Sequence, residues 1–225
     1  MPFPFFYASD IRSRFPQLRS GALLLEGIDA NADATPEISR FKRIVDQRLA
    51  GGSETEFAEI QAWRRTFSAM GIKPTRYRCA SEALLRRYRK EGALPALHPL
   101  IDLCNAASLA SAIPIAVFDT STITGALTVR LAYGDEVYET FSGETEHPDP
   151  GEIIFADEAG RAHARRWTNR QSGLSAIRSS TDRALIVAEA LHETAESDVA
   201  KLISRLDEAL RTIWPACLVK TMELR

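Results

Sequence analysis

The sequence lacks the short motifs by which many enzyme classes are recognised. Its 225 residues contain no G-x-x-x-x-G-K-[ST] phosphate loop, no G-x-G-x-x-G dinucleotide turn, no G-x-S-x-G nucleophile elbow and no H-E-x-x-H zinc motif. Its few histidines and cysteines are not spaced as metal-ligand pairs, and no C-x-x-C pair occurs. We therefore expect no metal, no cofactor and no disulfide framework. These residues are His98, His147, His163, His192, Cys79, Cys104 and Cys217.

Long apolar runs and an excess of either charge are also missing. No stretch reaches the roughly 18 apolar residues of a membrane span, and Pro2, Pro4 and Asp10 interrupt the apolar N-terminus, unlike a signal peptide. The 28 basic and 30 acidic residues give a net charge of −2, so any contact with phosphate must be local. Most of the basic residues are arginines, which can grip phosphate or carboxylate bidentately. The odd cysteine count fits a reducing compartment, so we expect a cytoplasmic protein without membrane contact.

The hydrophobic pattern predicts an α+β fold in a single domain over residues 1–225. Amphipathic helices are expected over 35–50, 53–70, 81–91, 98–111 and 195–212. Strands are expected over 22–28, 113–118, 126–133, 136–141, 153–156, 162–167, 184–190 and 217–222. Gly134 and Asp135 are expected to join two of these strands in a hairpin. We expect a largely antiparallel sheet or barrel over about 113–190, with helices packed from the N-terminal half and a C-terminal helix.

Charge is distributed unevenly along the chain. Residues 76–90 carry six basic residues against Glu82 alone, a local charge of +5, which indicates either a solvated helix face or a contact with phosphate. Residues 134–158 carry nine acids and no basic residue, whereas 161–170 carry four arginines and no acid. Adjacent strands are expected to pair these unlike charges. The residues that we assign to such pairs are Glu152, Arg161 and Arg165.

The stretch 162–173 leads from a predicted strand into a turn that is dense in amide, hydroxyl, guanidinium and indole groups. This mixture suits a pocket lining better than a core. Asp157 and Glu158 lie at the turn before this strand, so their carboxylates can flank the same cavity, although Asp157 is equally suited to forming the turn. In the fourth predicted helix, Asp102 and Asn105 interrupt an apolar face, so they must find partners or line a cavity.

An ordered series of motifs carries a resemblance to a known family. The motifs are A-S-E-A-L-L-R-R-Y-R-K-E-G-A-L-P at 80–95, L-I-D-L-C-N at 100–105, I-P-I-A-V-F-D at 113–119, G-A-L-T-V-R at 125–130, Y-E-T-F-S-G at 138–143, H-P-D-P-G-E at 147–152 and I-F-A-D-E at 154–158. In order and spacing they resemble the B3/B4 editing domain of the β subunit of bacterial phenylalanyl-tRNA synthetase. The resemblance covers about 76–193, leaving 1–75 as an N-terminal extension and 194–225 as a C-terminal helix and tail. The chain thus looks like a free-standing relative of the editing module.

The resemblance implies a function in tRNA editing. In the family, this module hydrolyses the ester of a tRNA charged with the wrong amino acid, which needs a positioned water and donors for the oxyanion rather than a covalent nucleophile or a metal. Asn105 matches the family's helix asparagine at the editing pocket, Cys104 stands where threonine is usual, and Glu158 lies near the carboxylate that recognises the side-chain hydroxyl. The family's pocket histidine falls on Ala116, so we hypothesise that His163 supplies an imidazole instead.

The sequence therefore predicts a trans-editing hydrolase that deacylates mischarged aminoacyl-tRNA. Its expected partner is the acceptor end of tRNA, with no DNA, and the need for a synthetase stays open. A turn over 167–172 replaces the family's glycine-rich turn and is expected to reshape the pocket. Two alternatives are a non-catalytic tRNA- or RNA-binding module and a small-molecule, amino-acid binding protein that reuses the pocket. The predicted catalytic residues are His163, Asn169 and Glu158, the substrate-binding residues Asn105, Cys104, Trp167, Thr168, Gln171 and Ser172, and the tRNA contacts Arg76, Arg78, Arg86 and Arg170.

Overall fold

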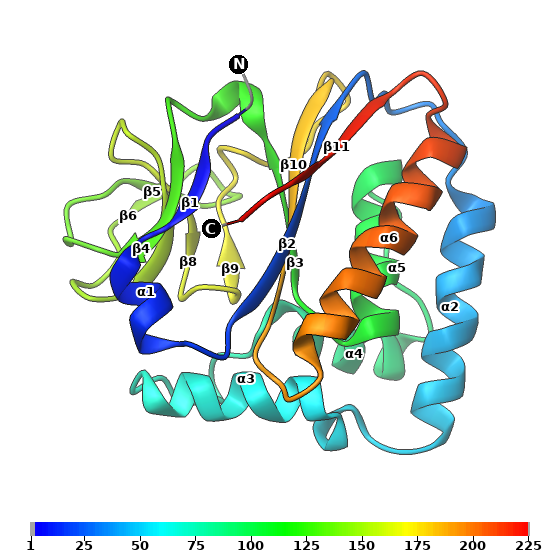
Figure 1. Ribbon diagram of the computed structural model, residues 1–225, viewed down its shortest axis with the longest axis horizontal. Helices are drawn as coiled ribbons and strands as arrows, with labels where there is room; N and C mark the ends of the chain where they lie inside the picture. The colour runs from blue at the N-terminus through cyan, green and yellow to red at the C-terminus, as the bar shows by residue number, and fades with distance from the viewer. Residues whose placement is uncertain (1–2, 225) are drawn as a thin grey trace.

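The computed structural model describes residues 3–224. Two larger β-sheets pack against one another, with helices against the outer face of one of them, and a third sheet has only two strands (Figure 1). The helices are α1 (Ser9–Arg14), α2 (Thr35–Ala50), α3 (Ala58–Ala69), α4 (Ala80–Glu91), α5 (Pro99–Ser111) and α6 (Ala195–Ile213), with 3-10 turns η1 (Glu54–Glu56) and η2 (Thr120–Thr122). The strands are β1 (Phe5–Tyr7), β2 (Arg19–Glu26), β3 (Ile115–Asp119), β4 (Leu127–Leu131), β5 (Tyr138–Glu139), β6 (Thr145–Glu146), β7 (Ile153–Ala156), β8 (Ala162–Arg165), β9 (Arg170–Gln171), β10 (Arg183–Ala190) and β11 (Leu218–Met222).

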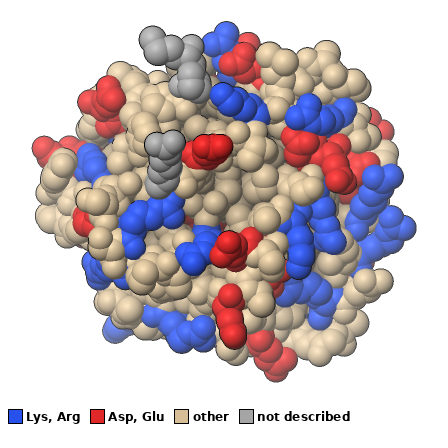
Figure 2. Space-filling view, viewed as in Figure 1, with Lys and Arg blue, Asp and Glu red and all other residues tan. Residues whose placement is uncertain are grey.

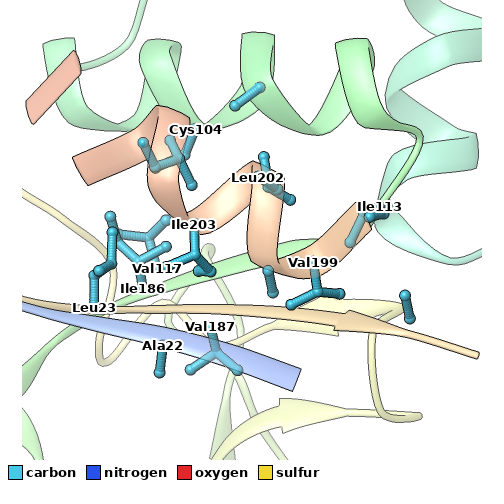
Figure 3. Close-up of a cluster of buried hydrophobic side chains, with 14 of the residues drawn as sticks. Ala22, Leu23, Cys104, Ile113, Val117, Ile186, Val187, Val199, Leu202 and Ile203 are labelled. Atoms are coloured by element: carbon cyan, nitrogen blue, oxygen red, sulfur yellow. The ribbon is translucent and has the colours of Figure 1, made fainter. Parts of the chain in front are cut away.

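The four-stranded sheet is antiparallel and has the order β11-β2-β10-β3, which places β3 at one edge. Its central strands are almost continuous apolar runs because both of their faces are covered. A Cβ atom on Gly21 would lie 2.5 Å from Cγ1 of Ile203, so the absence of a side chain lets α6 pack directly on β2. In Figure 3, Val199 and Ile203 of α6 point toward the strands that carry Ala22 and Val187.

The second sheet has the order β1-β4-β7-β8-β9. Its N-terminal strand β1 runs parallel to β4, and the remaining pairs are antiparallel. The rings of Phe118 on β3 and Phe155 on β7 lie 5.3 Å apart and join the two sheets in one core. The predicted sheet region over about 113–190 is thus completed by β1, β2 and β11 from outside it.

The α+β class, the helices from the N-terminal half and the C-terminal helix are confirmed. Gly92 ends α4 in the left-handed region, with φ of +74°, which glycine adopts without strain. The second predicted helix begins later than expected, at Ala58. The reason is that Ser53 and Glu56 form a capping box on the short turn η1 rather than on α3.

The predicted hairpin around Gly134 is wrong. Strand β4 pairs with β1 and β7, whereas β5 pairs with β6. The carboxylate of Glu136 accepts the backbone N–H groups of Tyr133, at 2.9 Å, and Gly134, at 3.0 Å, and it pairs with Arg130. This local capture folds the segment after β4 into a closed loop and directs β5 away from β4.

Two further observations concern the helices and the acidic, histidine and cysteine side chains of residues 3–224. No helix in this part of the chain is long and apolar enough to cross a membrane. The same residues hold no group of three or more His, Cys, Asp or Glu side chains that could bind a metal ion.

Candidate functional site

A cavity of about 450 Å³ opens between α5 and the edge strand β3. Ile101, Cys104 and Asn105 lie three and four residues apart, so α5 presents them on one side. Ile115 and Val117 are two residues apart on β3 and therefore share a face of that strand. The other lining residues are Leu97, His98, Phe141, Gln171, Ala176 and Ile177. The cavity thus brings together three of the predicted substrate-binding residues, which are Cys104, Asn105 and Gln171.

Two side-chain amides supply uncharged polar groups to this cavity. Within residues 3–224, the carboxamide of the half-buried Asn105 forms no hydrogen bond, so both its donor and its acceptor can serve a ligand. The Gln171 amide donates from Nε2 to the backbone carbonyl of Val117. That bond fixes the side chain and leaves Oε1 as an acceptor.

His98 contributes an imidazole of defined tautomer. Its Nδ1 accepts the backbone N–H of Leu100 at 3.2 Å and so caps α5. Burial lowers the pKa of His98, and a neutral ring that accepts at Nδ1 carries its proton on Nε2. Nε2 is buried and has no hydrogen-bond partner within residues 3–224. A buried donor without a partner is costly, and this one belongs to a residue that lines the cavity.

The thiol of Cys104 adds bulk rather than reactivity. Burial raises the pKa of Cys104 far above its usual range, and burial raises the pKa of Cys79 to about 11. Because the thiolate is the nucleophilic form, these buried thiols are inert at neutral pH. Cys217 is buried and free as well.

With this geometry in place, comparison with known proteins identifies the family. A model of the B3/4 domain matches residues 62–210. The chain belongs to the B3/4 domain family. It is also similar in fold to the crystal structure of an N-terminal fragment of the phenylalanyl-tRNA synthetase beta-subunit from Pyrococcus horikoshii, with a TM-score of 0.57 and 10% sequence identity. That match covers 100% of this chain and 52% of the other, so this chain spans about half of its length. No curated protein matches the chain.

The family and fold that the motifs resemble are therefore confirmed for this B3/4 domain. A second, smaller cavity of about 50 Å³ lies beside the first, and Gln171 lines both. Ala116, Trp167, Thr168 and Asn169 also border it. Of the predicted site residues in the turn after β8, Trp167, Thr168 and Asn169 thus lie at this smaller cavity rather than at the larger one.

The side chains of this turn are held mainly by contacts within the protein. Asn169 donates from Nδ2 to the carbonyl of Arg78 at 2.7 Å, and Ser172 donates to the carbonyl of Glu139 at 2.8 Å. The indole of Trp167 is fully buried and donates to Glu189 at 2.8 Å. These bonds connect β8 and β9 to the rest of the B3/4 domain.

The structure does not bring His163, Asn169 and Glu158 into one cavity. Glu158 is exposed at the turn before β8, whereas Asn169 lies beyond the other end of that strand. His163 is fully buried, with Nε2 at 3.3 Å from Asp157, and burial lowers its pKa. Since Ala164 lines the small cavity and side chains alternate along a strand, His163 points to the opposite face of β8. The Asp157 carboxylate accepts the backbone N–H groups of Ala159 and Arg161, so Asp157 has the turn-forming role that was predicted as its alternative.

Ion pairs occupy most of the arginines that the sequence offers to tRNA. Arg78 pairs with Glu82, Arg86 with Glu54 and Arg170 with Glu146. Within residues 3–224, Arg76 has no carboxylate partner. The expected pair of Arg165 with Glu152 is present, at 3.0 Å. Arg161 instead pairs with Asp157, four residues earlier in the turn between β7 and β8, at 2.8 Å.

Two polar residues of this B3/4 domain escaped prediction from the sequence. One is His98, whose position before Pro99 signalled a helix start but not a cavity. The other is Glu189, a buried carboxylate that accepts from Tyr7 and Trp167, both at 2.8 Å. The sequence did contain a sign of this buried carboxylate, because Glu189 is the one charged residue in the apolar run 184–190.

Proposed function

We propose that this B3/4 domain binds aminoacyl-tRNA and hydrolyses the ester bond of a mischarged one in the cavity between α5 and β3. The observation that carries the proposal is the Asn105 carboxamide, which lines that cavity and forms no hydrogen bond within residues 3–224, together with the buried, unpartnered Nε2 of His98, a second lining residue. The motif resemblance assigns Asn105 to the editing pocket independently. The proposed setting is the cytoplasm, with the whole chain acting as one domain around its shared core.

The proposed reaction is simple ester hydrolysis. Water adds to the ester carbonyl, the C–O bond to the terminal ribose breaks, and the proton of the water ends on the ribose oxygen. The N–H donors of Asn105 and His98 are suited to stabilising the negative oxygen of the tetrahedral intermediate. The hydrogen bond from the backbone N–H of Leu100 to Nδ1 already fixes the His98 ring, so this donor needs little reorganisation during the reaction.

The lining of the cavity indicates the class of amino acid. It contains no Asp, Glu, Lys or Arg side chain and is dominated by aliphatic groups such as Ile101, Ile115 and Val117. A charged side chain would lose hydration there without gaining a partner. We therefore propose that the rejected amino acid has an uncharged side chain, for which a cavity of this size has room.

Two asparagines distinguish the larger cavity from the smaller one. Replacing Asn105 by alanine is expected to slow deacylation roughly 10- to 100-fold, because one or two hydrogen bonds to the transition state are lost. Asn169→Ala is the matched control, since Asn169 is bonded to the carbonyl of Arg78. The measurement is release of free amino acid from a panel of correctly and incorrectly charged tRNAs. Loss of activity with Asn169→Ala alone would move the site to the small cavity, and no release by the wild type would contradict the proposed reaction.

The imidazole of His98 can be removed without uncapping α5. In His98→Asn, the side-chain oxygen still accepts from the start of the helix, because asparagine is among the best N-cap residues, while Nε2 is lost. We expect unchanged thermal stability and deacylation that is roughly 5- to 10-fold slower, the worth of one hydrogen bond. Equal rates for the variant and the wild type would show that His98 serves only as a cap.

A further inference from the structure

A third concavity, of about 420 Å³, collects four basic side chains away from the proposed reaction site. Arg14 comes from the end of α1, Lys73 and Arg76 from the segment after α3, and Arg166 from the turn after β8. Figure 2 shows Lys and Arg side chains gathered at the lower left of this face, over α1 and α3. The cluster therefore depends on the fold, since its members are up to 152 residues apart in a chain of 225.

These four cations differ from most arginines of the protein in having no carboxylate partner within residues 3–224. Arg78, two residues after Arg76, pairs with Glu82 at 3.3 Å. Two carboxylates also border the concavity, Asp149 and Glu152. Glu152 is engaged by Arg165 at 3.0 Å and by the backbone N–H of Arg166 at 2.8 Å. The concavity thus keeps an excess of positive charge.

Tyr77 holds two of the cations in place. The guanidinium carbon of Arg166 lies 4.4 Å from the centroid of its ring, and that of Arg76 lies 5.1 Å from it. Stacking on an aromatic ring orders a guanidinium while leaving its N–H donors free. Two like charges near one ring repel each other, and an anion between them would relieve that repulsion.

The backbone at this place is strained. Arg166 and Trp167 both have positive φ angles, +47° and +58°, which residues other than glycine rarely adopt. The conformation is fixed by two hydrogen bonds, from the N–H of Arg166 to Glu152 and from the N–H of Trp167 to the carbonyl of Ile153, at 2.7 Å. The strained backbone thus positions the Arg166 side chain on the same Tyr77 ring as Arg76.

We infer that this concavity binds phosphate groups of an RNA backbone. Guanidinium forks bind phosphate oxygens bidentately, and three separate segments supply the cations of this concavity. The choice of RNA over a free phosphate compound rests on the proposed function. The site would hold the body of the tRNA while its charged end reaches the cavity between α5 and β3.

The test is a double charge reversal, Lys73→Glu with Arg76→Glu. Both side chains are exposed, so the fold is expected to persist. The matched control is Arg43→Glu with Arg205→Glu, two exposed arginines on α2 and α6 without ion pairs within residues 3–224. Binding of uncharged tRNA is measured over a range of salt concentrations. We expect affinity to fall at least about tenfold and the salt slope to drop by about 1 to 2 in the first variant alone.

The outcomes separate this inference from the proposed function. Equal losses of affinity in the two double variants would overturn the phosphate site, even if deacylation in the other cavity is found. Loss confined to Lys73→Glu/Arg76→Glu would support the site, even if the wild type releases no amino acid. Titration with inorganic pyrophosphate forms a second arm. Saturable binding of pyrophosphate by a protein that binds no tRNA would overturn the assignment to RNA.

Discussion

Replacing Trp167 by alanine is expected to lower the free energy of unfolding by about 3–5 kcal/mol, the usual cost of truncating a buried tryptophan. The indole is fully buried, and its ring centroid lies 4.9 Å from that of Phe15 and 5.1 Å from that of Trp63. The change also removes the donor to Glu189. Alanine at a φ of +58° is also strained, so no relief of backbone strain offsets the lost packing and the lost hydrogen bond. Urea unfolding at constant pH measures the difference.

The adjacent residue provides the control for this prediction. The hydroxyl of Thr168 is buried without a hydrogen-bond partner within residues 3–224, so Thr168→Ala removes an unsatisfied group and is expected to change stability by less than about 1 kcal/mol. A similarly small effect of Trp167→Ala would be incompatible with a core role. It would favour the prediction that Trp167 lines a ligand pocket.

Local sequence signals predicted the five longer helices because those signals act within the helix itself, whereas the six-residue helix α1 was not predicted. Pro36 and Gly51 bracket α2, Pro99 begins α5 and Gly92 ends α4. The central strand β10 was equally visible as an apolar run, since its residues pack on both faces. Such features need no knowledge of distant partners.

Strand pairing was less accessible because it depends on distant segments. The predicted hairpin relied on the turn residue Gly134, but the carboxylate of Glu136 binds the same backbone. The vacant side of β4 is then filled by β1, whose residues lie more than 100 positions earlier. No periodicity within 126–141 carries that information.

The candidate site was predicted in part for the same reason. Cys104 and Asn105 share one helix face, so a single matching motif placed both at the cavity. The arginines were harder to interpret. Arg86 and Arg170 are paired with Glu54 and Glu146, which lie elsewhere in the sequence, and only the fold distinguishes them from the unpaired Arg76. A run of positive charge in a sequence therefore overstates the charge available to a ligand.

Glu189 makes stability fall as pH rises. Burial raises the pKa of this carboxyl to about 7 in the folded protein, whereas the pKa of a glutamate in an unfolded chain is about 4.3. Between these values the folded protein holds a proton that the unfolded chain has lost, so the free energy of unfolding falls by about 1.4 kcal/mol per pH unit. The stabilising effect is complete below the unfolded pKa and is lost as pH rises through the folded one.

Glu189→Gln is expected to remove this dependence. The glutamine oxygen can still accept from Tyr7 and Trp167, and no charge forms in the core at any pH. Urea unfolding at pH 5 and pH 8 should show the variant gaining about 2–3 kcal/mol over the wild type between those two pH values. Glu196→Gln, on a side chain that is 85% exposed, should give no such gain. If the advantage of Glu189→Gln is the same at both pH values, the carboxyl is ionised throughout. Its two donors then compensate fully for its burial.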